Sequence, residues 1–248
     1  MKRFAYVRTM VYVCLALASP AVAQQPASDA WRVTLTPYLI GAAISGTTGA
    51  RGVEAEIDLP ASDIFSNLEF GAMGIVAARK GDWGLGTDLI FMALGATADR
   101  PAADVDFNQT AFAFYGLRRL NAVAEATFGL RVNGLDGGLT FKEESVVPAG
   151  TELSQSKWWV DPIVGLRLHS NSARRVNATL YGEIGGLGLG SDLEWQIFPV
   201  VDVRVLDRMS LELGYRWLSM DYTTGDGSDH FTWDTLTQGP VVGFKFQF

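Results

Sequence analysis

The chain has 248 residues, of which 48% are hydrophobic and 11% aromatic, and its formal net charge is −7. This acidic balance argues against nucleic-acid binding, because proteins that bind nucleic acids carry basic patches. After the first 23 residues no run of 18 or more apolar residues occurs, which excludes a helical membrane protein. The only cysteine is Cys14, so the chain cannot form an internal disulfide or a thiolate metal site.

The N-terminal segment has the layout of a secretory signal peptide. Three basic residues surround the start of the chain, an apolar core follows at residues 11–18 (VYVCLALA), and residues 21–23 (AVA) form a small-x-small cleavage site. The apolar core is shorter than the about 20 residues that a membrane-spanning helix needs. We therefore predict a cleaved signal peptide over residues 1–23 and an exported domain over residues 24–248, with a net charge of −10 once the three basic residues are lost.

Hydrophobicity alternates with a period of two along most of the exported region, which is typical of β-strands. Ile197 and Val201, for example, alternate with Gln196 and Asp202. Stretches of about ten residues are long enough to cross a membrane as tilted strands. The intervening positions hold isolated charges among Gly, Thr, Ser and Asn, which fits an enclosed polar lumen better than the solvated face of a soluble sheet. We predict ten strands, at residues 31–44, 68–79, 83–97, 106–119, 123–139, 154–169, 175–188, 193–206, 209–222 and 231–248.

The connections between these strands alternate between short and long, as they do in bacterial outer-membrane barrels. The predicted fold is all-β: a single antiparallel transmembrane β-barrel of about ten strands, with eight or twelve as alternatives. The short turns are predicted to be periplasmic, at residues 80–82, 120–122, 170–174 and 207–208. The longer loops are predicted to be external, at residues 45–67, 98–105, 140–153, 189–192 and 223–230.

Two features do not follow directly from a plain barrel. In the longest connection, residues 53–58 alternate like a strand, and residues 60–68 have helical spacing, with Ser62 or Asp63 as the expected cap. We expect a strand extension and a short helix that rests on the barrel mouth, folds into it, or is simply an ordered external loop. In addition, four prolines lie inside predicted strands, where each removes a ladder hydrogen bond, and the pattern offers no reason for them: Pro37, Pro162, Pro199 and Pro240.

The chain ends in a strand whose alternate apolar residues lead to a terminal Phe. Val242, Phe244, Phe246 and Phe248 share one face of this strand, which resembles the assembly signal of bacterial outer-membrane barrels. Together with the signal peptide and the alternation, the whole exported chain resembles small outer-membrane barrels of the OmpA-type membrane-domain and opacity-protein class. The resemblance implies an outer-membrane location, folding by the barrel-assembly machinery, and contact with outer-membrane lipid and lipopolysaccharide. It carries over no catalytic residue and leaves the oligomeric state open.

The inward positions of the predicted strands carry six acids and six bases. Unpaired charge is costly in a low-dielectric interior, so this balance predicts a paired network. Two interpretations remain: the network fills a narrow barrel, or the charges line a small selective pore. The twelve residues are Arg32, Asp88, Glu125, Arg131, Asp161, Arg167, Glu183, Asp202, Arg204, Glu212, Arg216 and Lys245.

Catalytic and metal sites have little support. His230 follows Asp226 and Asp229 in the last predicted external loop, and His169 lies at a periplasmic turn without an evident acidic partner. A general base needs placed partners, and Asp226 and Asp229 lack the ordered ligand series of a calcium loop. We therefore expect no catalytic residue, metal or cofactor.

The sequence thus predicts an outer-membrane barrel that is not an enzyme. Its expected role is structural or in surface interaction, with a lumen largely filled by salt bridges. One alternative is a small passive pore for ions or small solutes. A second is an outer-membrane hydrolase that uses His230 at the external rim.

Overall fold

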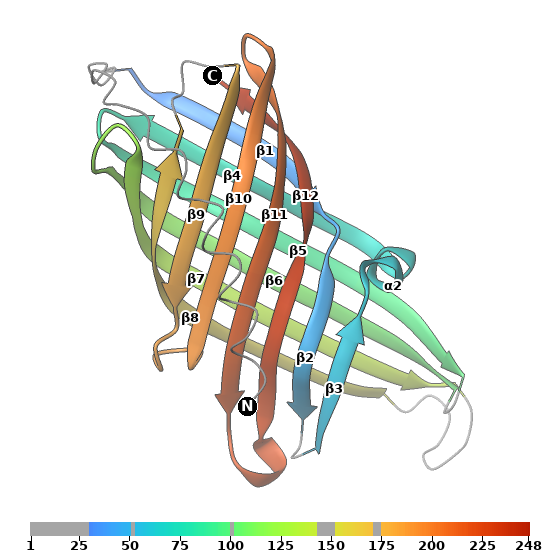
Figure 1. The fold of residues 1–248 in the computed structure, drawn as a ribbon. Coiled ribbons are helices and arrows are strands. Elements are labelled where there is room, and N and C mark those ends of the chain that lie inside the picture. The colour runs from blue at the N-terminus through green and yellow to red at the C-terminus, as the bar shows by residue number, and fades with distance from the viewer. Residues whose placement is uncertain (1–29, 51–52, 100–101, 143–151, 171–174) are drawn as a thin grey trace, which may run out of the picture.

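The computed structural model describes residues 30–50, 53–99, 102–142, 152–170 and 175–248. Ten strands close into an antiparallel barrel in the order β1-β4-β5-β6-β7-β8-β9-β10-β11-β12, with β12 pairing back onto β1, and two further strands, β2 and β3, extend from the β12 edge (Figure 1). The predicted all-β barrel is therefore confirmed. The predicted signal peptide lies outside the described residues, so its cleavage stays a prediction. No helix in the described part of the chain is long and apolar enough to cross a membrane.

The described part of the chain is built of elements that are almost all strands. Their bounds are β1 (Arg32–Ile40), β2 (Ala43–Ala50), β3 (Val53–Leu59), α2 (Ala61–Ser66), β4 (Leu68–Lys80), β5 (Trp83–Asp99), β6 (Ala102–Arg119), β7 (Ala124–Phe141), β8 (Glu152–His169), β9 (Val176–Gly185), β10 (Leu193–Leu206), β11 (Met209–Thr224), η1 (Gly227–Asp229) and β12 (Phe231–Gln247).

The period of two places apolar and polar residues on opposite faces of the wall. Along β10, the buried residues Gln196, Phe198 and Asp202 alternate with the exposed Ile197 and Val201. Because the side-chain period is two, this register fixes which face of every paired strand points inward. The predicted bounds of this strand, residues 193–206, agree with the structure.

One predicted strand near the N-terminus is wrong, and the cap predicted for the following helix is wrong as well. The strand predicted over residues 31–44 is broken at Gly41 and Ala42 into β1 and β2, and β2 runs on to Ala50 and pairs with β3 as a hairpin. The strand extension and the short helix expected in the first long connection are confirmed as β3 and α2, whereas the continuation of β2 to Ala50 was not expected. The helix begins after Pro60 without a side-chain cap, so neither Ser62 nor Asp63 caps it.

A third difference lies at the C-terminal end of β9. This strand ends at Gly185, three residues before the predicted end, because the next residues leave the extended conformation. Gly186, Leu187 and Gly188 all have positive φ, at 76°, 54° and 78°. Leu187 is the only non-glycine residue of the described chain with positive φ, and the left-handed region is unfavourable for a residue with a Cβ.

The four strand prolines lie where the hydrogen-bonding ladder is interrupted anyway. The β1–β12 pairing skips Pro37, and the β10–β11 pairing skips Pro199. The β8–β9 pairing stops at Ile163, next to Pro162, and Pro240 faces Gly41 at the break between β1 and β2. A missing N–H costs little at such positions. The prolines therefore mark interruptions of the wall that the sequence pattern did not reveal.

The pairing between neighbouring strands changes along the length of the barrel. At the periplasmic end, which carries the short turns, the ten strands are continuously paired. Toward the external end, β8 pairs with β9 only up to Ile163, and β1 pairs with β4 only up to the Pro37–Gly74 pair. Beyond these points the wall consists of two separate sheets, one of β4 to β8 and one of β11, β12, β2 and β3, because β9 ends at Gly185 and β10 begins at Leu193. The strands of the two sides run in clearly different directions in Figure 1.

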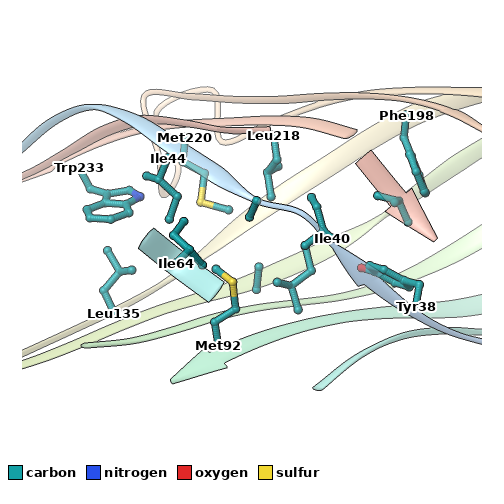
Figure 2. Packing of buried hydrophobic residues seen from close by; sticks show 14 of the residues in the cluster. Tyr38, Ile40, Ile44, Ile64, Met92, Leu135, Phe198, Leu218, Met220 and Trp233 are labelled. Atoms are coloured by element: carbon teal, nitrogen blue, oxygen red, sulfur yellow. The ribbon is translucent and has the colours of Figure 1, made fainter. Parts of the chain in front are cut away.

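The inner faces of the two sheets pack against each other at the external end. Trp159 of β8 stacks on Tyr222 of β11 with ring centroids 4.1 Å apart, and Phe107 of β6 stacks on Trp233 of β12 at 5.7 Å. The external half of the barrel is therefore closed by a hydrophobic core, in the way that two sheets pack in a sandwich. Figure 2 shows part of this core, which includes Ile40, Ile44, Ile64, Met92, Leu135, Leu218, Met220 and Trp233.

Candidate functional site

The charged lumen of the barrel is the most unusual concentration of polar groups in the described chain. Nearest the periplasmic mouth, Lys245 of β12 lies between Asp202 of β10 and Glu212 of β11, with its Nζ atom 2.6 and 2.8 Å from the two carboxylates. Three strands thereby contribute to a single ion triplet. The two acids repel each other unless a cation lies between them, so Lys245 holds the three neighbouring strands in register.

A second ion cluster is centred on Glu125 of β7. Its carboxylate accepts two hydrogen bonds from the guanidinium of Arg79, the second at 2.6 Å, and His169 lies 3.7 Å away. Because Arg79 comes from β4, this bidentate pair crosses the lumen between strands that are not neighbours in the sheet. The sequence shows no evident acidic partner for His169, and the structure corrects this, since Glu125 reaches it from the next strand.

Arg167 of β8 is held by aromatic rings rather than by a carboxylate. Its guanidinium lies 4.9 Å from the ring centre of Tyr115 and 4.7 Å from that of Tyr181, and it donates a hydrogen bond of 2.8 Å to the Tyr115 hydroxyl. A guanidinium between two aromatic faces is stabilised by cation–π attraction. This arrangement fills the lumen with flat side chains from three strands.

Arg216 of β11 forms a closed triangle with Asp88 of β5 and Tyr38 of β1. The guanidinium contacts Asp88 Oδ2 at 2.7 Å and donates to the Tyr38 hydroxyl at 2.8 Å, while that hydroxyl donates to Asp88 Oδ1 at 2.8 Å. Arg216 is 1% exposed. The triangle joins both sides of the barrel, and it lies at the border with the hydrophobic core, where Tyr38 is also a member.

Arg131 of β7 binds two acids, Glu183 of β9 and Glu194 of β10. Its Nη2 atom lies 2.6 Å from Glu183, which also accepts hydrogen bonds from Tyr181 and from Gln196, the latter at 2.9 Å. All of these side chains are buried. Buried charge is tolerated only where its partners are complete, and here the two acids share one guanidinium and neutral donors.

Asp161 of β8 is fully buried and is surrounded by neutral donors. It accepts hydrogen bonds from the Ser191 backbone N–H at 2.5 Å, the Ser191 hydroxyl at 2.7 Å, Asn133 at 2.7 Å and Trp159 at 3.0 Å. Ser191 lies in the connection between β9 and β10. Asp161 therefore binds this connection to β8 on the external side of the point where the β8–β9 ladder ends.

The structure brings ten of the twelve predicted lumen residues into the interior, where all are buried or half-buried. The other two, Arg32 and Arg204, lie on the inward side of their strands but are exposed at the periplasmic rim, and no ion pair joins either of them to another described residue. Two charged residues that were not predicted join these clusters instead, Arg79 and Glu194. The clusters described above therefore contain five Lys and Arg side chains and seven carboxylates rather than six of each.

The sequence contains only weak indications that the lumen residues outside the predicted set point inward. Glu194 precedes Gln196 by two positions on a strand whose alternation was clear, so its inward direction followed from the same register. Arg79 follows Ala77 on β4, where small residues blur the alternation. Tyr38 and Tyr115 look like ordinary apolar positions of a strand, and nothing in their neighbourhood indicates that their hydroxyls bind arginine.

His230 at the external rim does not have the surroundings of a catalytic base. Its Nε2 atom lies 3.1 Å from the Thr232 hydroxyl and 3.6 Å from Glu54, and its Nδ1 atom faces the Gly225 carbonyl at 3.2 Å. In a hydrolytic triad the acid orients the imidazole from the nitrogen opposite the nucleophile. Here the acid and the hydroxyl share one nitrogen, so the cluster is not a relay.

The exterior of the barrel is apolar, the reverse of a soluble protein. Large hydrophobic side chains are exposed around the middle of the wall on almost every strand, including Leu35, Leu85, Phe114, Phe128, Leu130, Val164, Leu166, Val201, Leu213, Val242 and Phe244. Along the continuously paired part of the wall, the ladder leaves no backbone group unpaired toward lipid. An apolar exterior around a charged interior, within a closed antiparallel ring, is the arrangement of a bacterial outer-membrane barrel.

The protein is a small outer-membrane β-barrel. The predicted location and class are thereby confirmed. The predicted assembly signal lies on the last strand of this barrel, with Phe244 and Phe248 exposed and Phe246 half-buried, and its role in assembly stays a prediction.

Comparison with known proteins adds no closer relationship. No protein-family model and no curated protein matches the chain. Among solved structures, the attachment invasion locus protein Ail of Yersinia pestis is similar at a TM-score of 0.41 and 11% identity, covering 89% of this chain and 99% of that one. A FadL homologue of Pseudomonas aeruginosa gives 0.38 and 8%, covering 89% and 90%, and Neisserial surface protein A gives 0.32 and 11%, covering 90% and 100%. Similarities this low do not indicate a function.

Proposed function

We propose that this protein is a non-conducting outer-membrane barrel with a structural or surface-interaction role, and that it is not an enzyme. The observation that supports this best is the continuity of the filling. From the periplasmic mouth, the Lys245 triplet, the Glu125 cluster and the Arg216 triangle occupy the lumen in turn. From there toward the external end, the hydrophobic core between the two sheets fills the barrel as far as the stacked rings of Trp159 and Tyr222. Ten-stranded barrels have little space once side chains enter the lumen.

The external end offers a polar surface suited to interaction. On β11, β12, β2 and β3, one cross-strand row runs from Asp221 to Asp234, Thr47 and Glu56. Three of these four residues are acidic, and like charges on neighbouring strands are maintained only at some cost in stability. Such a row favours partners that bring positive charge to the cell surface. Outer-membrane lipid and lipopolysaccharide around the wall, and the barrel-assembly machinery during folding, are the other partners in this proposal.

Conductance of the purified barrel in planar lipid bilayers tests the proposal. We expect no stepwise current in a neutral salt solution at moderate voltage, because ion pairs and packed side chains block the lumen along its length. A large general porin reconstituted in the same bilayers shows that the assay detects channels. Folded protein is verified before each recording by its altered mobility in unheated detergent gels.

Clear single-channel steps from the wild-type barrel would reject the filled lumen in favour of a passive pore. Single-channel steps that appear only in the double variant Arg216→Ala, Asp88→Ala would support the filled lumen. They would show that the wild-type ion pair contributes to closing the path. The hydrolase alternative has no support from the geometry at His230, and the variant His230→Ala is expected to leave the folded barrel unchanged.

A further inference from the structure

The barrel wall has an opening in its external half that is filled by a helix rather than by strand pairing. The β1–β4 ladder ends at the Pro37–Gly74 pair, so residues 68–73 of β4 are paired only with β5. On the other side, β3 is paired only with β2. Between these two edges the described chain has no ladder hydrogen bonds, and α2 connects them by lying in the opening, as Figure 1 shows at the right of the molecule.

Between its chain connections to β3 and β4, the helix buries a single residue, Ile64. Its side-chain hydrogen bonds stay local: Ser66 and Asn67 donate to the Asp63 carbonyl, and Ser62 donates to the Asp63 carboxylate. Among the described residues, one backbone hydrogen bond joins this segment to the barrel: the N–H of Gly95 donates to the carbonyl of Asn67, just after the helix. A helix of six residues has no independent stability, so its position depends on the burial of Ile64.

Ile64 is 4% exposed and points into the hydrophobic core between the two sheets. Figure 2 shows it among Ile44, Met92 and Met220, with Leu135 and Trp233 nearby. Methionine side chains adapt to occupants of different shape more easily than branched residues do. Ile64 is thus an aliphatic group in an adaptable apolar site, and that site begins directly behind the opening.

The outer border of the opening is apolar as well. Phe65 on α2 is 52% exposed, Phe70 on β4 is 59% exposed and Leu39 on β1 is 55% exposed, while Leu59 ends β3 beside the helix. These residues continue the lipid-facing belt of the wall. The opening therefore faces hydrocarbon chains of the membrane, and the site behind it matches them in chemistry.

We propose that α2 is a displaceable plug and that the end of a membrane-lipid acyl chain takes the place of Ile64 between the two sheets. When the helix moves outward, Ile64 leaves the core and exposes its apolar surface to lipid rather than to water. The exchange replaces one aliphatic group by another, so the hydrophobic core stays filled. This inference is independent of the proposal that the barrel does not conduct, because the ion clusters on the periplasmic side of the core stay in place when the helix moves.

Photolabelling in proteoliposomes tests the proposal. The barrel is reconstituted with a phospholipid that carries a diazirine near the end of one acyl chain, irradiated, digested and analysed by mass spectrometry. We expect adducts on the inward-facing Met92 and Met220 in addition to the outward-facing belt. Ile64→Ala, which shortens the plug, should raise the inward labelling several-fold, and the milder Ile64→Val should raise it less.

Val76→Ala is the matched control, since Val76 is an exposed aliphatic residue of β4 on the lipid-facing side. It should leave inward labelling unchanged. Labelling confined to outward side chains, in the wild type and in both Ile64 variants that retain barrel mobility in unheated gels, would overturn the proposal. A free fatty acid with the same diazirine, added from the aqueous side, serves as a second arm. Inward labelling by that probe but not by the phospholipid would also overturn it, because the occupant would then come from solution.

Discussion

Arg216 illustrates how single residues keep charge inside a membrane barrel. Its guanidinium uses both terminal nitrogens, one on the carboxylate of Asp88 and one on the Tyr38 hydroxyl. The partners are 128 and 178 positions away in the chain. The sequence placed Arg216 and Asp88 in the lumen through their alternation, but alternation says nothing about which inward residues meet across it. That choice depends on strand tilt and stagger, which are properties of the closed ring.

Removing one partner of this buried group should be much more costly than removing both. We expect Arg216→Met to lower the free energy of unfolding by about 3–5 kcal/mol, because it leaves Asp88 charged and buried without its cation. The double variant Arg216→Met with Asp88→Leu should lose clearly less than the sum of the single losses. Urea unfolding in lipid vesicles measures all three.

Lys245→Met is the comparison, since its ion triplet lies at the partly exposed periplasmic mouth. Lys245 itself is partly exposed, but the two acids that remain, Asp202 and Glu212, are both buried and share this one cation, so the loss should be at least as large as for Arg216→Met. Additive effects of the Arg216 and Asp88 substitutions would contradict the view that the two residues act as one buried unit.

At the level of elements, clear alternation predicted strands well and failed where the wall is interrupted. The bounds of β10 followed from its pattern, whereas β1 and β2 were joined into one strand. The break at Gly41 depends on Pro240 across the ladder, a partner about 200 positions away. The alternation of residues 53–58 predicted β3, whereas the continuation of β2 to Ala50 was missed because residues 45–50 are small and polar and resemble a loop. The helix α2 was expected, but its burial depends on a core formed by distant strands.

The connection between β9 and β10 permits a prediction of its own. Leu187 has φ of 54°, whereas its neighbour Leu189 does not have positive φ, and both are largely exposed. A left-handed conformation costs a residue with a Cβ about 1–2 kcal/mol relative to glycine. Leu187→Gly should therefore give a barrel more stable than Leu189→Gly by about that amount.

Thermal or urea unfolding of the two glycine variants in the same lipid measures this difference. Both variants lose one exposed leucine and gain the same flexibility in the unfolded chain, so these contributions cancel in the comparison. Equal stabilities would show that the backbone at Leu187 is not strained.

At the scale of the whole molecule, the barrel is a uniformly sealed ring at its periplasmic end and two packed sheets at its external end. Charge fills the first part, and hydrophobic side chains fill the second together with the buried Asp161. The sequence predicted the ring and the charged filling. It did not predict the division, because inward apolar residues such as Ile44 and Leu135 alternate with outward ones in the same way whether they face a pore or a core.

Hydrogen exchange in lipid vesicles should reveal this division. Amides of β11 and of its partner residues 241–246 in β12, which are paired on both sides, should be the most protected. Residues 68–73 of β4 and the edge of β3 should exchange faster, since each has a strand on one side only. Uniform protection around the external half would contradict an interrupted wall, and peptide-level mass spectrometry distinguishes the two results.

The last strand has a wider role than its position suggests. Its whole length pairs with β11, while its other edge is shared, with β1 along one part and β2 along the next. The ring can thus be sealed only when the seventeen residues of β12 are in place. Before that moment, β1 and β11 present free backbone edges that can join wrong chains. A cell that makes this protein must therefore shield those edges until synthesis and export have delivered β12.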